Sequence, residues 1–170
     1  MCGIVGYVSK TKYELSKQLT AIKHRGPDAI GTYYDEKLGF GHTRLSIVDT
    51  KAEANQPFTL EDKNYVIVFN GEIYNFKDLR SDLTLKGYKF KTTSDTEVLL
   101  NTYIEYGSKM FEYLDGMFAF SIFDKKKNSI FCARDHLGIK PFYTILTKQT
   151  RSYILHLNYL QSLNFQLQKR

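Results

Sequence analysis

The sequence predicts an α+β fold built on antiparallel sheets. Strand-like segments stand in adjacent groups along the chain, and helix-like segments lie between those groups. With 170 residues, the chain is long enough for one domain with a substantial core. Apolar residues make up 42% and charged residues 25% of the sequence, which is typical of a folded globular chain and argues against a disordered or collagen-like one.

The first third of the chain is predicted to hold several short strands and one short helix. Residues 4–8 alternate glycine with β-branched and aromatic side chains, which indicates a strand. Apolar residues recur at helical spacing over residues 13–22, which indicates an amphipathic helix. Three further short strands are predicted at residues 32–34, 40–43 and 45–48.

The strongest strand signal is Tyr65–Phe69, a run of large apolar residues. Asn70-Gly71 follows directly, and this dipeptide readily takes positive φ, so a tight turn is predicted there. Asn75 is expected to cap a helix that ends at Gly87.

A second helix and a hairpin are predicted in the region that follows. Ser94–Glu97 has the S-x-x-E form of a capping box, in which two side chains satisfy free backbone N–H groups at a helix start. The helix is predicted to end at Gly107. Residues 117–124 and 129–134 are predicted to pair as a hairpin around a lysine-rich turn.

The positive charge of the chain is concentrated in residues 144–170. This segment contains no acidic residue and contributes +4 of the net charge of +6, so residues 1–143 carry only +2. Its four basic residues are Lys148, Arg151, Lys169 and Arg170. A nucleic-acid-binding surface needs a basic face with base-stacking groups on the folded body. We therefore expect no nucleic-acid partner.

The sequence carries no signal for secretion, a membrane span, a disulfide framework or a metal site. The N-terminus lacks a basic segment followed by a long apolar stretch, and no apolar run approaches a membrane span, so we expect a cytoplasmic protein without a membrane partner. Cys2 and Cys132 form no CxxC pair, and the histidines have no metal-ligand spacing. Cys132 is expected to be a small buried hydrophobe and His42 a structural hydrogen-bonding residue.

Cys2 can become a nucleophile that carries its own base. Methionine aminopeptidase removes Met1 when the second residue is small, and cysteine qualifies. The exposed residue then holds a thiol beside a free α-amine, whose ordinary pKa is about 8. The neutral fraction of that amine can accept the thiol proton through a water molecule and later pass it to a leaving group.

Such a nucleophile needs oxyanion donors and, for an amino-acid substrate, charged partners. Asn70-Gly71 offers a side-chain amide and an unobstructed backbone N–H. Arg44 suits a substrate carboxylate, and Asp95 suits a substrate ammonium group. Each also has an ordinary interpretation, because Arg44 can form a surface ion pair, Asp95 can cap a helix and Asn70-Gly71 can form a hairpin turn. Spacing alone leaves open whether these groups meet.

Six motifs occur in the order and at the spacing of one known family. They are Met1–Gly6, His24–Asp28, His42–Asp49, Asn70–Asn75, Ser94–Glu97 and Arg134–Pro141. Over residues 1–143 the chain resembles the glutaminase half of glutamine-dependent asparagine synthetase, a class II glutamine amidotransferase. The resemblance implies an N-terminal-nucleophile (Ntn) hydrolase fold, an αββα sandwich of two antiparallel sheets between helix layers.

The resemblance also implies glutamine hydrolysis through a γ-glutamyl thioester on Cys2, which releases ammonia and then glutamate. By match of position, Asn70 and Gly71 form the oxyanion hole, and Arg44 holds the substrate carboxylate. Glu72 and Asp95 surround the substrate ammonium group. The backbone of four consecutive residues lines the pocket: Leu45, Ser46, Ile47 and Val48.

In this family the glutaminase half itself uses no cofactor. ATP and magnesium serve a C-terminal synthetase domain, where ammonia converts aspartate to asparagine. No segment here reads Ser-Gly-Gly-x-Asp-Ser, so we expect that domain to be absent and a separate synthetase chain to be the candidate partner. Two alternatives are an inactive truncated fragment or pseudogene product, and a related amidotransferase that aminates a different acceptor.

The sequence departs from the family pattern after Tyr143. Residues 144–170 are rich in Leu, Gln and Asn, whereas the family continues with a strand and a segment resembling Phe-Ala-Ser-Glu-Ile-Lys. We interpret this tail as the product of a frameshift. A final strand of the sandwich would then be missing, which would leave a sheet edge open.

Sequencing the gene tests the frameshift. Residues 153–159 can be encoded by codons that, when read two bases later, give Tyr-Phe-Ala-Ser-Glu-Leu, close to the family segment. We expect the genomic bases to encode that segment in the alternative frame. If they do not, the frameshift interpretation is wrong.

Overall fold

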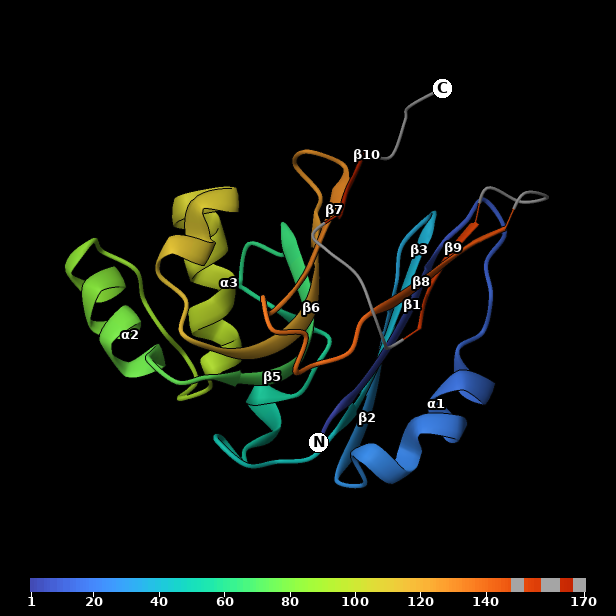
Figure 1. Cartoon of the computed structure of the whole chain (residues 1–170), viewed down its shortest axis with the longest axis horizontal. Helices are drawn as coiled ribbons and strands as arrows, with labels where there is room; N and C mark the ends of the chain where they lie inside the picture. The colour runs from blue at the N-terminus through green and yellow to red at the C-terminus, as the bar shows by residue number, and fades with distance from the viewer. Residues whose placement is uncertain (148–151, 157–162, 167–170) are drawn as a thin grey trace.

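The chain folds into four layers, with two antiparallel sheets face to face and helices on both outer sides (Figure 1). The computed structural model describes residues 1–147, 152–156 and 163–166. This arrangement confirms the predicted α+β class and the αββα sandwich.

The first sheet has the strand order β2-β3-β1-β9-β8. Its strands are β1 (Gly3–Val8), β2 (Ala29–Tyr34), β3 (Leu38–Arg44), β8 (Tyr143–Thr147) and β9 (Ser152–His156). The strand predicted at residues 45–48 does not form, since β3 ends at Arg44 and the chain enters a loop. In that loop the backbone N–H groups of Leu45 and Ser46 bind side chains instead of a neighbouring strand.

The second sheet has the order β10-β7-β6-β5-β4. Its strands are β4 (Phe58–Thr59), β5 (Tyr65–Ile73), β6 (Gly116–Asp124), β7 (Ser129–Arg134) and β10 (Leu163–Gln166). The predicted β6–β7 hairpin is confirmed. The turn predicted at Asn70-Gly71 is wrong, because β5 runs straight through both residues and pairs with β6. Gly71 instead permits a close approach, since a Cβ there would collide with the backbone oxygen of Met117.

Three α-helices and three short 3₁₀ helices complete the described part of the chain. They are α1 (Ser16–Ile22), η1 (Lys23–Arg25), η2 (Ala52–Ala54), α2 (Phe76–Leu85), α3 (Asp95–Tyr106) and η3 (Gly107–Glu112). The helix predicted from residue 13 therefore begins three residues later. Within the described residues, no helix has the length and apolar character needed to span a membrane.

The predicted helix caps form only in part. Ser94 Oγ accepts a hydrogen bond from Thr96 N–H at 3.0 Å, as a capping residue does. The Glu97 carboxylate, however, accepts from the N–H groups of Lys91 and Thr92 and does not complete the capping box. The Asn75 side chain binds the backbone of Tyr113 and Asp115 instead of capping α2.

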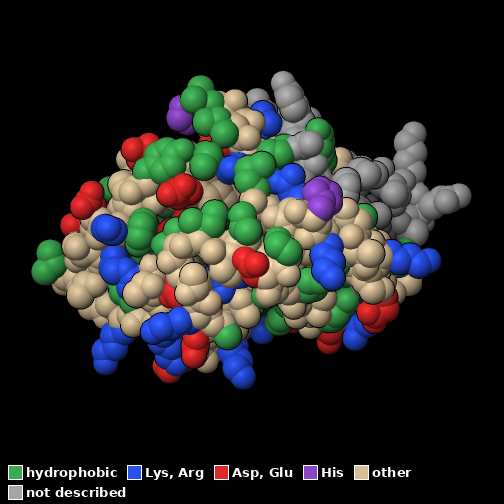
Figure 2. Space-filling view, turned by 90° about the horizontal axis from the view of Figure 1, so that it is seen from below, with side chains coloured by type: hydrophobic (Ala, Val, Ile, Leu, Met, Phe, Trp, Pro, Cys, Tyr) green, Lys and Arg blue, Asp and Glu red, His purple; other side chains and the backbone are tan. Residues whose placement is uncertain are grey.

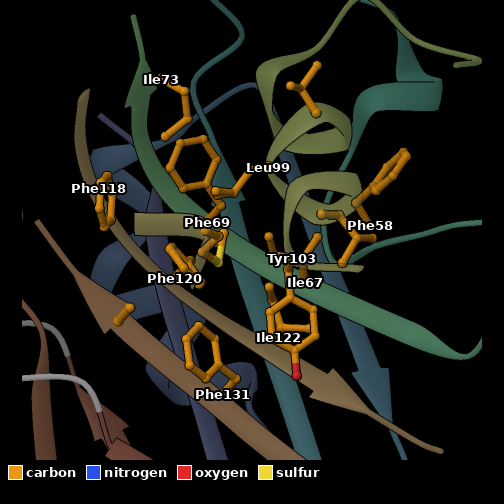
Figure 3. Packing of buried hydrophobic residues seen from close by; sticks show 14 of the residues in the cluster. Phe58, Ile67, Phe69, Ile73, Leu99, Tyr103, Phe118, Phe120, Ile122 and Phe131 are labelled. Carbon is orange, nitrogen blue, oxygen red and sulfur yellow. The ribbon is translucent and has the colours of Figure 1, made fainter. Parts of the chain in front are cut away.

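Three apolar clusters hold the layers together. Beneath α3, rings from β5, β6 and β7 pack against the helix, as Figure 3 shows for Phe69, Phe120 and Phe131. A second cluster, which contains Cys132 as predicted, fills the space between the sheets, and a third lies under α1. His42 joins the sheets through a hydrogen bond from Nε2 to the Phe69 carbonyl oxygen at 3.2 Å, which confirms its structural role.

The tail predicted to leave a sheet edge open instead provides strands to both sheets. β9 pairs with the outer edge of β1, and β10 pairs with β7. The predicted open edge is therefore wrong for this structure. The physical reason is that strand pairing uses backbone N–H and C=O groups, which every residue type other than proline supplies in full.

Replacing Phe120 by Ala tests the importance of the cluster beneath α3. Phe120 is fully buried at 0% exposure, so the substitution leaves a cavity and should lower the free energy of unfolding by about 3–5 kcal/mol. Denaturant unfolding measures this loss. The matched control is Leu85→Ala at 88% exposure, which should change the same quantity by less than about 0.5 kcal/mol. Equal effects of the two substitutions would contradict this account of the core.

Candidate active site

A cavity of about 110 Å³ opens where several parts of the fold meet, among them the start of β1, the end of β3, the second half of β5 and the start of α3. Nine of the ten predicted site residues line it. They are Cys2, Arg44, Leu45, Ile47, Val48, Asn70, Gly71, Glu72 and Asp95. The fold thus brings together groups that sequence spacing could not show to converge.

Ser46 is the predicted residue that lies outside the cavity lining. Its backbone N–H donates to the Asp28 carboxylate at 2.7 Å, so this peptide unit faces the loop after η1. The pocket wall that was predicted to run continuously over residues 45–48 is therefore interrupted at this position.

Cys2 is half-buried, and its thiol lies against the backbone of Leu45. The Leu45 N–H donates to Sγ at 3.4 Å, and Sγ lies 3.6 Å from the Leu45 carbonyl oxygen. Burial raises the pKa of the Cys2 thiol, although the Leu45 N–H, the α-amine of Met1 and Arg44 act in the opposite direction. A thiol with a raised pKa needs a nearby proton acceptor before it can attack a substrate.

Asn70 places a free amide donor in the cavity. Its side chain is 1% exposed, and among the residues that the structure describes Nδ2 has no hydrogen-bond partner. A buried donor without a partner costs on the order of 1–3 kcal/mol, so such a group is expected to bind something that enters the site.

The Gly71 N–H lies on the edge of β5 that faces away from β6. Tyr74 N–H donates to the Asp115 carbonyl oxygen, on the side of β6. Along an antiparallel pair of strands, successive residues point their N–H groups to opposite sides. The odd-numbered residues of β5 therefore point their N–H groups away from β6. On that edge Phe69 N–H donates to Gln56 and Ile73 N–H donates to Asp95. Gly71 N–H lies between them on this edge, and Asn70 and Gly71 both line the cavity.

Two carboxylates, Asp95 and Glu72, line the same cavity. Asp95 begins α3 and accepts a hydrogen bond from Ile73 N–H at 3.1 Å. Burial raises the pKa of Asp95 to about 6, opposed by backbone N–H donors, and the Glu72 charge raises it further. Two neighbouring acids that repel each other favour a bound cation such as an ammonium group.

Arg44 is buried at the end of β3 and holds the loop that follows. Its Nη1 donates to Lys51 O at 2.8 Å and to Asn55 Oδ1 at 2.7 Å, and its Nη2 donates to Asp49 O. Within the described residues no carboxylate forms an ion pair with it, so the ordinary surface ion pair does not occur. A guanidinium has five N–H donors, and those not used by the loop can bind an anion.

Gln56 and Lys140 are two of the cavity-lining residues that the sequence did not predict as site residues. Gln56 Oε1 accepts from Phe69 N–H at 2.6 Å, and its Nε2 donates to Thr96 Oγ1 at 3.3 Å, which ties β5 to α3. Lys140 belongs to the Arg134–Pro141 motif, and that motif was the one signal that could have drawn attention to it. In the part of the chain that is described, no cluster of three or more His, Cys, Asp or Glu side chains could hold a metal ion.

The chain is similar to known enzymes in sequence. It is 48% identical over 158 residues to asparagine synthetase 1 [glutamine-hydrolyzing] of Bacillus subtilis, with 88% of this chain and 25% of the relative covered. It is 39% identical over 160 residues to asparagine synthetase B of Escherichia coli K12, with 91% and 28% covered. The chain thus spans about a quarter of the length of these relatives.

Solved structures show the same fold at lower identity. Glutamine phosphoribosylpyrophosphate amidotransferase from B. subtilis aligns with a TM-score of 0.74 at 22% identity, with 91% of this chain and 41% of that chain covered. A glutamine aminotransferase class-II domain protein from Silicibacter pomeroyi aligns with a TM-score of 0.52 at 14% identity, with 95% and 82% covered.

A family model described as a glutamine amidotransferase domain matches residues 1–163. The match passes Tyr143 and enters the tail, while the domain boundary at residue 143 and the frameshift stay predictions. Because nearly the whole chain is matched, the chain belongs to the glutamine amidotransferase domain family.

Proposed function

We propose that the chain hydrolyses glutamine to glutamate and ammonia, as the glutaminase part of an asparagine-synthesising system. The observation that carries the proposal is the content of one cavity. It combines the Cys2 thiol, the Asn70 amide, which no other described residue binds, a guanidinium and two carboxylates.

The cavity suits glutamine in size and in the groups it offers. A volume of about 110 Å³ corresponds to on the order of seven to eleven water-sized groups, and glutamine has about ten non-hydrogen atoms. Arg44 would bind the α-carboxylate, and Glu72 with Asp95 would bind the α-ammonium group. The carboxamide would then be the part of the substrate that reaches Cys2.

The proposed mechanism begins after removal of Met1. The neutral α-amine of Cys2 accepts the thiol proton through a water molecule, and the thiolate forms a bond to the carboxamide carbon. The carbonyl oxygen becomes an oxyanion, for which Asn70 Nδ2 and Gly71 N–H are the donors. The amine returns the proton to the leaving nitrogen, so ammonia departs and a thioester remains. Water then attacks the thioester, releases glutamate and restores the thiol.

We further propose that a synthetase partner uses the ammonia to make asparagine from aspartate, with ATP and magnesium bound on that partner. This second proposal is supported by two observations. The relatives in sequence are asparagine synthetases, and exposed apolar side chains surround the cavity, where a partner could dock. Around the cavity and the loops beside it, Ile47, Tyr74, Leu137 and Ile139 are each more than half exposed. Figure 2 views the molecule from below the orientation of Figure 1 and shows hydrophobic side chains gathered in several groups on that face. The half that hydrolyses glutamine is proposed to need no cofactor, and its location in the cytoplasm stays a prediction.

Labelling of Cys2 tests the proposed function. A glutamine analogue that carries a diazoketone in place of the carboxamide should alkylate Cys2 of the mature chain, and that chain should hydrolyse glutamine. Cys2→Ala, or an added N-terminal tag, should abolish both labelling and hydrolysis, because each removes the thiol or its neighbouring amine. Mass spectrometry and an ammonia assay measure the outcomes.

The matched control uses the other cysteine. Cys132 is 1% exposed within the sandwich, so Cys132→Ala should leave labelling and hydrolysis unchanged. Activity that survives the tag would remove the N-terminal mechanism. A folded mature chain that neither reacts nor hydrolyses glutamine would support the alternative of an inactive fragment.

Asp95→Asn separates substrate binding from stability. Loss of the charged partner for the ammonium group should raise the KM for glutamine about tenfold or more at pH 8. Because the pKa of Asp95 is raised on folding, its charge lowers stability above the unfolded-state pKa, and Asn should not reduce the free energy of unfolding at pH 8. In the wild type, kcat/KM should fall as the pH drops through about 6, since protonation removes the Asp95 charge. An unchanged KM in the variant would contradict this role.

A further inference from the structure

Lys140 is a lysine buried beside the proposed nucleophile. It is 4% exposed, lines the cavity with Cys2, and places Nζ 3.0 Å from the Met1 sulfur. Within the described residues no carboxylate lies within ion-pair distance of it. Lysines are seldom buried without a paired charge, so this placement calls for an explanation.

The loop that carries Lys140 is held in place by one carboxylate. Asp135 accepts hydrogen bonds from the backbone N–H groups of Ile139 at 2.8 Å, Lys140 at 2.9 Å and Phe118 at 3.2 Å. Gly138 takes a φ of +68°, a conformation that favours glycine, and lets the loop fold back over Asp135. The backbone of Lys140 is therefore fixed against β6, and its ammonium group is directed to the start of β1.

Removal of Met1 changes what Lys140 faces. The uncharged thioether near Nζ is lost, and the α-amine of Cys2 becomes free in the same cavity. Arg25 already lies at this point, because its Nε donates to the Cys2 carbonyl oxygen at 3.0 Å. A protonated α-amine would then stand near two other cations, an arrangement that disfavours its charge.

Charged and titratable groups reach this part of the cavity from several elements. They are Cys2, Arg25, Arg44, Glu72, Asp95 and Asp135. Burial and the Arg25 charge lower the pKa of Lys140, whereas Asp135, Glu72 and Cys2 oppose this change. The carboxylates of Asp135 and Glu72, and the Cys2 thiol in its ionised form, favour a positive charge on Lys140. The fixed backbone of the lysine keeps that charge at the start of β1.

We propose that Lys140 is a positioning residue whose ammonium group keeps the α-amine of mature Cys2 neutral, and so able to accept the thiol proton, near pH 7. The inference rests on the proposed function, since it explains how the amine that acts as base stays unprotonated. Lys140 transfers no proton in this role. Its charge acts through the amine of residue 2, and the same charge favours the thiolate once the proton has moved.

The test follows the titration of residue 2 in the full mature chain. Cysteine labelled with ¹³C gives two signals, from Cys2 and from buried Cys132, which serves as an internal reference. The amine and thiol titrate as a coupled pair, so both macroscopic steps are followed. Lys140→Met and Lys140→Gln remove the charge, Lys140→Arg keeps it, and Lys12→Met removes an exposed charge from the loop before α1.

Removing the charge should move the lower titration step of Cys2 upward by about one pH unit, as expected for the loss of a like charge from the same cavity. Because protonation of Asp95 already shapes the acidic limb of kcat/KM, the kinetic readout is kcat at saturating glutamine, whose acidic limb should move in the same direction. Lys140→Arg and Lys12→Met should keep both close to wild type. A loss of kcat without a shift in either profile would reduce Lys140 to a structural role and overturn the proposal.

Two further outcomes keep the inference separable from folding and from the proposed function. If neither neutral variant folds, the wild-type titration decides, because an α-amine that titrates at or above its ordinary value of about 8 contradicts the proposal. If the wild type hydrolyses no glutamine, the proposed function fails. The titration of Cys2 still shows whether Lys140 lowers the pKa of the α-amine of Cys2.

Discussion

The site depends on the part of the outer edge of β5 that no strand of the described residues covers. β4 pairs only with Val66 and Ile67 of this strand. The backbone N–H groups on the same edge beyond Ile67 therefore need hydrogen-bond acceptors from other parts of the fold. The Gln56 side chain takes the N–H of Phe69, and the Asp95 carboxylate takes the N–H of Ile73. These two hydrogen bonds draw the loop before β4 and the start of α3 against the strand. The N–H of Gly71, between them, is left facing the space that becomes the cavity.

The same constraint explains why charged groups are buried at this point. Asp95 is held at the strand edge by its hydrogen bond to Ile73, and burial there raises its pKa to about 6. Arg44 is held by carbonyl oxygens of the loop after β3 and has no carboxylate partner among the described residues. The proposed amino-acid substrate carries a carboxylate and an ammonium group on one carbon, and these would face Arg44 and Asp95 respectively.

The sandwich provides the rigidity that such a site needs. Aromatic rings beneath α3 fix the face of the β5 sheet, and the hydrogen bond between His42 and Phe69 ties that sheet to β3. Burial lowers the pKa of His42 to about 3, so the imidazole stays neutral and the link between the sheets persists across the physiological pH range. The strand that begins just after Cys2 and the strand that carries Asn70 therefore keep a constant relation.

The sequence by itself determined the elements whose signals are local. The run at Tyr65–Phe69, the start of α3 at Ser94 and the β6–β7 hairpin follow from side-chain periodicity and capping chemistry within a few residues. Ten site residues were predicted, and the nine of them that line the cavity all belong to the six motifs. Residue types in a fixed order thus carry chemical information without coordinates.

Only the tertiary structure decided how those residues act. Asn70-Gly71 lies within a strand and not in a turn, because pairing with β6 outweighs the local preference of the dipeptide. The partners of Arg44, the raised pKa of Asp95 and the burial of Lys140 depend on groups far away in the sequence. Hydrogen-bond partners and desolvation arise only when distant segments pack together, and neither is encoded in the spacing of residues along the chain.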